Sequence, residues 1–220
     1  MVTPLDLTRR TFRASLGLFI FAFGDYLTIC AGIGLAPWEV FCMGLSYHWP
    51  LSFGITNVLI SLTIVAIDLM LHERIGLGTI LDAFIVGLGI DLFNWLNLVP
   101  KITNVWFGLA IMTLGLLIMS FAQYLYMSAG LCCGPRDSLL VAIGKRLRKV
   151  PIGAVEILIL VAVLLVGRLL GGPIGIGTVY ATVGAGVSMQ FVFHLLHFEP
   201  RSVVHIGFGG LLSRFQKQKT

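Results

Sequence analysis

Charged side chains are scarce in this 220-residue chain. Asp, Glu, Lys and Arg make up 11% of the residues, hydrophobic residues make up 57%, and the mean hydropathy is +0.96. A typical soluble domain carries about 25% charged residues, so this composition excludes an ordinary soluble protein. Apolar runs of roughly 20 residues recur along the chain, and each is long enough to cross a hydrocarbon core of about 30 Å. The sequence predicts an all-α membrane protein with no room for a soluble catalytic domain.

The chain also lacks the residue patterns of metal, disulfide and enzyme sites. Its cysteines form no pair of CxxC motifs and have no histidine at zinc-ligand spacing, so neither a zinc site nor a disulfide framework is indicated. Its GIG and GLG strings follow no strand, which is typical of close helix packing rather than of dinucleotide binding. No histidine cluster or nucleophile pair is present. We expect no metal, no cofactor and no enzymatic activity.

The excess of basic residues, 15 against 10 acidic ones, gives a net charge of +5. In a membrane chain this excess indicates topology rather than nucleic-acid binding. Arg9, Arg10 and Arg13 precede an apolar run at 14–33 that is too long for a signal peptide and contains Asp25. We therefore interpret residues 1–13 as a basic cytoplasmic N-terminus, and we expect the lipid bilayer and a small solute as partners, with no nucleic acid.

An internal repeat organises the chain. AGIGLAPWEVFCMGLS at 31–46 aligns without a gap on AGLCCGPRDSLLVAIG at 129–144, a shift of 98 residues, and IGLGT at 75–79 aligns on IGIGT at 174–178 after one inserted residue. Such self-similarity indicates two copies of one structural unit. We expect a first membrane repeat at 14–100 and a second at 101–198.

Each copy contains one long apolar run, a short segment that begins with proline, and two further long runs. We expect long helices at 14–33, 52–71, 77–98, 104–131, 152–170 and 176–197, and short helices at 37–46 and 135–144. Ten residues reach only about halfway across the core, so the short helices are predicted to be re-entrant. Proline suits the first turn of a helix and glycine a sharp approach; the residues of the two turns are Gly34, Pro37, Cys132, Cys133, Gly134 and Pro135.

Three spans per copy would insert the second copy upside down relative to the first, as two inverted repeats. With the N-terminus inside, thirteen of the fifteen basic residues then lie in cytoplasmic segments, which satisfies the positive-inside rule. The alternative is eight spans in two parallel repeats, which leaves Arg74, Arg136 and Arg168 outside. Both arrangements place both termini in the cytoplasm. The basic tail at 199–220 is either a short interfacial helix or a disordered segment.

The motifs GIGLAPWEVF, GLCCGPRDSLL, IGLGT and IGIGT, in this order and in two copies, resemble the bacterial YczE/YyaS/YitT-type integral membrane proteins, and the YczE-like branch most of all. The resemblance covers residues 10 to 197. It implies a multi-pass protein of a bacterial inner membrane, of a kind that is commonly taken to be a transporter, and it carries over no catalytic or ligand-binding residues.

Polar residues inside the predicted spans are candidates for function, because an ionisable group there costs at least about 2.5 kcal/mol. The repeat pairs most of these acids with a neutral partner. The aligned pairs are Asp91 with Gln190, Asn57 with Glu156, Asp25 with Gln123, and Glu39 with Asp137. Asp91 is the strongest candidate because Gly87, Asp91 and Asn94 share one helical face in mid-span; a structural hydrogen bond is the alternative. Asp25, Glu156, Asp68 and Asp82 are close enough to helix ends to lie at headgroup level, where acids are ordinary.

The short helices offer a second candidate site. Glu39 and Asp137 each occupy the third position of their helix, where an acid complements the helix dipole, so capping alone explains them. Two half-helices that enter from opposite faces would also meet N-end first and present free N–H groups to a solute. Trp38 and Arg136 hold matching positions, and they would stack on a solute and bind a carboxylate, unless Trp38 is an interfacial anchor.

Two minor candidates remain. Cys132 and Cys133 suggest thiol chemistry, or only small apolar residues at a turn. His194 and His197 lie on one face at a metal-binding spacing but have no third ligand, which favours a wetted interfacial pair.

The leading hypothesis is a small secondary transporter or channel-like permease with a midplane site, coupled to protons through Asp91. The alternative is an accessory or substrate-capture membrane subunit that acts with a partner protein. Glycine-rich faces permit a homodimer.

Overall fold

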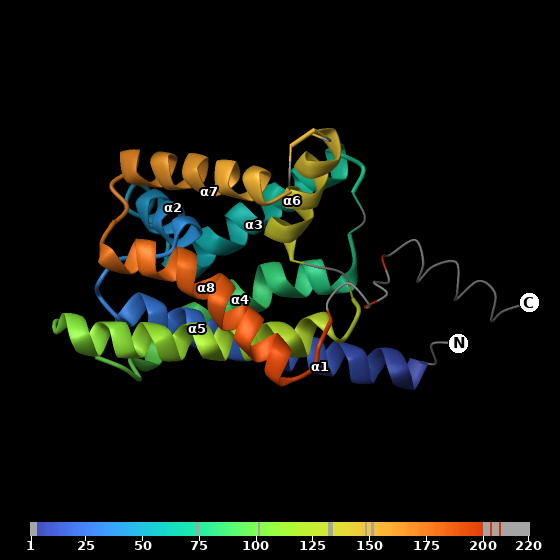
Figure 1. Cartoon of the computed structure of the whole chain (residues 1–220), viewed down its shortest axis with the longest axis horizontal. Coiled ribbons are helices and arrows are strands. Elements are labelled where there is room, and N and C mark those ends of the chain that lie inside the picture. The colour runs from blue at the N-terminus through green and yellow to red at the C-terminus, as the bar shows by residue number, and fades with distance from the viewer. Residues whose placement is uncertain are drawn as a thin grey trace, which may run out of the picture.

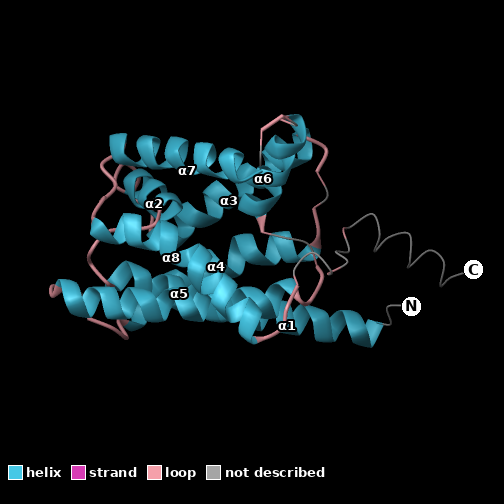
Figure 2. Cartoon of the chain, viewed as in Figure 1, coloured by secondary structure: helices cyan, strands magenta, loops and turns pink. Residues whose placement is uncertain are grey.

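The computed structural model describes residues 4–73, 75–100, 102–131, 134–147, 149–150, 152–199, 203 and 207, without the side chains of 4, 152–154 and 156. Within these residues every regular element is a helix, which confirms the predicted all-α class (Figures 1 and 2). The helices are α1 (Pro4–Cys30), α2 (Pro37–Ser46), α3 (Phe53–Met70), α4 (Leu77–Leu96), α5 (Val105–Met127), α6 (Pro135–Arg146), α7 (Ile152–Leu169) and α8 (Ile176–Leu195).

Five helices are long and apolar enough to cross a membrane, namely α1, α3, α4, α5 and α8. The apolar stretch found in α7 is shorter, Ile157–Leu169. Large apolar side chains on the outer faces of α7 and α8, such as Leu158, Leu165, Val179 and Val187, are exposed. An apolar outer surface of this kind suits contact with lipid. The chain is therefore a helical membrane protein.

Helix α1 begins ten residues earlier than predicted, at Pro4 instead of residue 14. Arg9, Arg10 and Arg13, in the segment interpreted as a basic N-terminus, therefore lie on the first turns of this helix. Proline at the start of a helix and an acid in its first turn both favour initiation, and Pro4 and Asp6 supply them. The predicted tail helix at 199–220 falls almost entirely outside the described residues.

The long helices run side by side between two ends of the bundle (Figure 1). We call the end where α1 begins and α8 finishes the terminal end, and the opposite end the far end. At the far end the Ile102 N–H donates to the Cys30 carbonyl. At the terminal end the Arg10 guanidinium donates to the Ala129 carbonyl. These two bonds hold α1 against the segments that lead into and out of α5.

Helices α1 and α5, the first helix of each copy, pack against each other at the centre. Glycines at matching positions permit this close approach. A Cβ atom on Gly115 would lie 2.7 Å from the Gly24 carbonyl oxygen, and one on Gly17 would lie 3.1 Å from the Ala122 oxygen. Since 17 and 115, and likewise 24 and 122, differ by 98, the same contact occurs once from each copy. Small residues at such a crossing let two backbones meet.

The two IG-X-GT motifs make a second reciprocal contact. The Gly78 N–H donates to the Leu131 carbonyl at 2.8 Å, and the Gly177 N–H donates to the Ile33 carbonyl at 2.8 Å. In each motif the threonine hydroxyl accepts from the backbone N–H three residues earlier, which satisfies a free donor at the start of α4 and of α8. Each motif thereby fixes the loop that leads into the short helix of the other copy.

The short helices α2 and α6 lie against α7 and α3, and their C-terminal ends point to opposite ends of the bundle. At the far end the His48 ring lies 3.2 Å from the Leu170 carbonyl oxygen, just beyond α2. At the terminal end Arg146, the last residue of α6, donates to the Leu71 carbonyl at 3.0 Å. Their first turns meet in the interior, where the candidate site lies.

Candidate functional site

Arg136, in the first turn of α6, is the centre of the site. Its guanidinium donates to Glu39 Oε1 on α2 at 3.3 Å and to Asn57 Oδ1 on α3 at 2.6 Å. The same group lies over the Trp38 ring, 5.0 Å from the ring centroid. The Cys42 sulfur is close to both polar partners, 3.6 Å from Asn57 Oδ1 and 3.9 Å from Arg136. A single cation thus joins three helices.

The local sequence explains why Glu39 and Arg136 meet. Pro37 and Pro135 each occupy the start of a short helix, and the residues before them, Ala36 and Gly134, are extended. Proline fixes the first turn without loss of a hydrogen bond. Because both helices begin in the interior, the side chains of their first turns are directed at each other rather than at water. One carboxylate oxygen of Glu39 therefore accepts from Arg136 on the other short helix. Capping of α2 by Glu39 does not explain this contact.

The second Glu39 oxygen, Oε2, is buried and has no hydrogen-bond partner among the described residues. The residue is 5% exposed. Asp25 on α1 is buried as well, and it interacts electrostatically with Glu39 and Arg136. Burying a charge is costly unless it is paired and its remaining hydrogen-bonding atoms are satisfied. Glu39 Oε2 therefore remains available to accept a hydrogen bond.

A cavity of about 110 Å³ adjoins Arg136. Five helices, α1, α3, α4, α5 and α6, contribute mainly polar and aromatic residues to its lining. The lining residues are Phe21, Asn57, Ser61, Asp82, Val86, Gln123, Tyr126, Gly134, Pro135, Arg136 and Asp137. A water molecule takes up about 30 Å³ of liquid, so the cavity is of a size for a small solute or a few waters.

The structure places two further acids between helices. Asp82 lines the cavity and interacts electrostatically with Arg136 and Asp137. Asp68 is fully buried at the terminal end of α3. Sequence reasoning also missed Ser61 as a lining residue. The available signal was its spacing, because Ser61 follows Asn57 by one helical turn and so shares its face.

Asp91 lies apart from these residues, at the seam between α3 and α4. Its carboxylate accepts from the Gly54 N–H at 2.8 Å and from the Ser52 hydroxyl, which caps the start of α3 by accepting from the Ile55 N–H. This is the structural hydrogen bond that the sequence left as an alternative. Gln190, its partner in the repeat, is exposed on α8. The structure therefore does not bring Asp91 and Gln190 into the site.

Other sequence candidates have definite places. Trp38 stacks on Arg136 and is only partly exposed. Gly34 packs against Gly175 at the far end, where a Cβ atom would lie 2.8 Å from the Gly175 nitrogen. The rings of His194 and His197 are stacked with centroids 6.5 Å apart. Cys132, Cys133 and the side chain of Glu156 lie outside the described residues.

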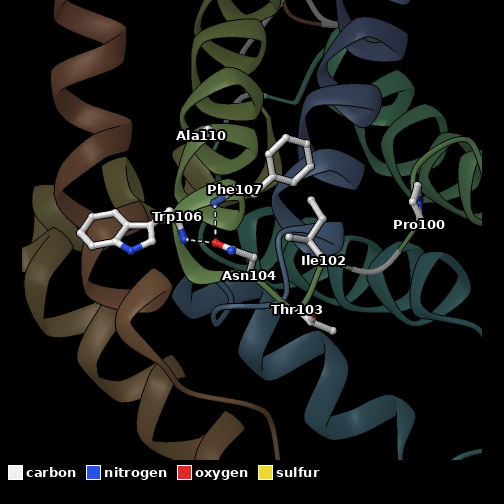
Figure 3. Close-up of a pocket in the computed structure, with 7 residues that line it drawn as sticks. All are labelled: Pro100, Ile102, Thr103, Asn104, Trp106, Phe107 and Ala110. Carbon is white, nitrogen blue, oxygen red and sulfur yellow. Dashed lines mark hydrogen bonds between the residues drawn. The ribbon is translucent and has the colours of Figure 1, made fainter.

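A second hollow, of about 710 Å³, opens at the far end around the start of α5 (Figure 3). Its lining is mostly apolar, and Trp106 there is 81% exposed. Its one side-chain amide, Asn104, accepts from the Trp106 and Phe107 N–H groups and so caps α5. The amide oxygen of Asn104 is thus committed to the helix cap, and none of the described residues that line the hollow is charged, which leaves the Arg136 cavity as the better candidate site.

Comparisons with known proteins agree with the expected resemblance. A family described as "Family of unknown function (DUF6198)" matches residues 8–194. The chain is 33% identical over 181 residues to the uncharacterized membrane protein YczE of Bacillus subtilis, covering 80% of this chain and 81% of that protein. It is 32% identical to the uncharacterized protein YyaS of the same organism, covering 81% and 89%, and 31% identical to an uncharacterized protein of Haemophilus influenzae, covering 81% of each. No solved structure matches. The resemblance to YczE- and YyaS-type proteins is confirmed.

Proposed function

The chain belongs to the family of unknown function DUF6198, and we propose that it is a small secondary transporter or channel-like permease of a bacterial inner membrane. One observation carries the proposal. The first turns of two short helices meet in the interior through Arg136 and Glu39, beside a polar cavity. Helix N-termini present free N–H groups and partial positive charge, and in transporters such broken helices form the solute site near the midplane.

The proposed architecture is six spans with α2 and α6 as re-entrant half-helices in two inverted repeats. The reciprocal contacts support it, because each copy makes the same glycine and IG-X-GT contacts to the other. The pattern of helix pairs supports it too: α1 packs on α4 as α5 packs on α8, and α2 packs on α7 as α6 packs on α3. The distribution of Lys and Arg supports cytoplasmic termini at the terminal end.

The charges of the site favour a small solute that brings hydrogen-bond donors. Arg136 faces four carboxyl groups, those of Asp25, Glu39, Asp82 and Asp137. Two of its donors are already engaged, one with Glu39 and one with Asn57. An inorganic anion would meet this excess of acid, whereas an ammonium, amine or amide group would pair with the free oxygen of Glu39 or with Asp82. We therefore propose a small cationic or dipolar solute, with binding and passage rather than catalysis as the activity.

Unequal packing of the two copies supports a protein with two conformations. The α3–α4 seam is closed where Gly87 lies against Gly54, a Cβ atom on Gly87 being 2.5 Å from the Gly54 oxygen. Gly186 is the matching position of the second copy, and a Cβ atom there would meet nothing within 4 Å in the part of the chain that the structure describes. In a transporter built from an inverted repeat, alternating access is expected to arise when the two copies exchange conformations. Here the α3–α4 seam would open while the α7–α8 seam closes.

Ligand-dependent thermal stability of the purified protein tests the proposal. We would screen ammonium, small amines, amino acids, inorganic anions, thiols and vitamins. A ligand that binds only the folded state adds about 2.7 kcal/mol at a hundredfold excess over Kd. We expect stabilisation by an amine or amino acid and none by inorganic anions. Ser61→Leu, which fills the cavity, should abolish the shift, whereas Thr63→Leu on the exposed face of the same helix should retain it.

The same ligand should then enter sealed vesicles that contain the protein. A ligand that binds but does not enter would favour the substrate-capture role with a partner protein. No stabilisation by any compound, from protein shown to be folded, would contradict the proposed solute site and favour the accessory role.

A further inference from the structure

Asp68, near the C-terminal end of α3, is the most completely buried acid of the described chain, with 0% of its surface exposed. Neither of its carboxylate oxygens has a hydrogen-bond partner among the described residues. Its backbone carbonyl accepts from the Glu73 N–H at 2.9 Å. A buried carboxylate in this position is expensive as an anion, whereas the protonated acid carries no net charge.

Three charged groups near this end of α3, those of Glu73, Lys145 and Arg146, are paired with other atoms. Glu73, which interacts electrostatically with Asp68, forms an ion pair with Lys145 at 2.6 Å. Arg146 donates to the carbonyls of Ala142 and Leu71. On α4 the nearest acid in sequence to this end is Asp82, in the cavity. Glu73 is itself an acid and so disfavours a second negative charge, which leaves a proton as the simplest counterpart for Asp68.

Asp68 is also aligned with the cavity. Asn57, Ser61 and Asp68 are separated by four and seven residues, so they share one face of α3. Asn57 and Ser61 line the cavity, and Asp68 is about 10 Å further along the helix, towards the terminal end. Buried Ile64 lies between Ser61 and Asp68 on this face.

Helix α6 connects the two positions. Its first turn carries Arg136 of the site, and its last turn carries Lys145 and Arg146, which hold the segment 71–73 that follows Asp68. A movement of α6 that accompanies solute binding would therefore alter the surroundings of Asp68 as well.

We infer that Asp68 is a proton-binding site of this protein, placed between the solute cavity and the terminal end of the bundle. The carboxylate takes up one proton from the aqueous phase at that end and becomes a neutral acid. It releases the same proton to that phase when a movement of α6 places a cation or a water molecule beside it. As a coupling site it rests on the proposed transport function; as a proton-binding site it does not.

Infrared spectroscopy of the purified protein tests the inference, because a protonated carboxylic acid has a carbonyl stretching band that a carboxylate lacks. We expect one such band, seen as the pH is lowered below neutral, that is missing from Asp68→Asn and persists in Asp6→Asn, the variant of an exposed acid in the first turn of α1. Bands of the other acids of the interior, such as Asp25 and Asp82, are common to the wild type and both variants and cancel in the difference spectra. A spectrum of Asp68→Asn identical to that of the wild type, from acidic to alkaline pH, would overturn the inference.

Thermal stability gives a second readout that does not depend on spectroscopic assignment. Asn has the size and neutrality of the protonated acid, so Asp68→Asn should melt no lower than the wild type at neutral pH and should lose stability less as the pH rises. A large loss of stability in Asp68→Asn would indicate an ionised Asp68 with a specific partner, and would overturn the inference. The band remains measurable if vesicles show no transport, so failure of the proposed function and failure of this inference are distinguishable.

Discussion

Trp38 and Arg136 occupy the same position in the two copies of the repeat, and their side chains stack on each other with 5.0 Å between the guanidinium carbon and the ring centroid. Two equivalent residues of a repeat touch only where the copies meet on their common axis. The contact thus places the first turns of α2 and α6 on that axis. It also means that Arg136 is shielded on one face by an aromatic ring and is open to the cavity on another.

The ion pair between Arg136 and Glu39 should matter more to stability than the one between Lys145 and Glu73. Removal of one partner of a buried pair leaves an uncompensated charge and typically costs about 3 to 5 kcal/mol, whereas exposed pairs contribute about 0 to 1 kcal/mol. Lys145 is exposed and Glu39 is buried. We expect Arg136→Gln to lower the melting temperature in detergent strongly and Lys145→Gln to leave it nearly unchanged. Addition of Glu39→Gln to Arg136→Gln should recover part of the loss; equal losses in the two single variants would contradict the prediction.

Gly87 and Gly186 are matching positions with opposite surroundings, which makes them a matched pair of variants. Gly87→Ala places a methyl group against the Gly54 backbone and the Val58 side chain, and overpacking of this kind costs about 1 to 3 kcal/mol. The methyl group of Gly186→Ala meets no described residue within 4 Å, and alanine favours a helix over glycine by about 1 kcal/mol. Thermal unfolding should show a clear loss for Gly87→Ala and none for Gly186→Ala. A loss in both variants would show that the α7–α8 seam closes as well.

Asp91 should affect stability without affecting the solute site. Asp91→Ala removes the acceptor for the Gly54 N–H and should cost about 1 kcal/mol, as for other helix caps. Asp91→Asn retains a side-chain oxygen at that position and should cost less. Both variants should retain the ligand-induced thermal shift of the wild type. Loss of the ligand-induced thermal shift in Asp91→Asn, measured on protein shown to be folded, would indicate that Asp91 belongs to the site.

The accessibility of residue 47 distinguishes six spans from eight. Tyr47 follows the last residue of α2 and is exposed. In the six-span arrangement a re-entrant α2 returns to the periplasmic side, whereas a spanning α2 would bring this residue to the cytoplasm. We expect a single cysteine at Tyr47, in a variant without the four native cysteines, to react with an impermeant thiol reagent applied to intact cells. Protection in intact cells with reaction after lysis would favour eight spans.

Apart from the start of α1, the positions of the described helices followed from the sequence with small errors, because apolar runs, proline and glycine act locally. The start of α1 was missed since the hydropathy of residues 4–13 is low, whereas helix formation there depends on Pro4 and on packing that is not local. The spacing of the acids, by contrast, did not reveal their surroundings. Asp91 looked central because it is in mid-span, but α3 begins well inside the bundle and its first turn meets Asp91.

The amino-acid sequence by itself determined that the chain is a helical membrane protein of two similar halves, since these properties depend on hydropathy and on repeated local signals. It also singled out Glu39, Arg136, Trp38 and Asn57 as candidates. Only the tertiary structure decided that these four meet, that Asp82 and Ser61 join them at a cavity, and that Asp68 is buried without a partner. The physical reason is that burial and partnership of a polar group depend on the approach of other helices, which residue spacing along one helix does not specify.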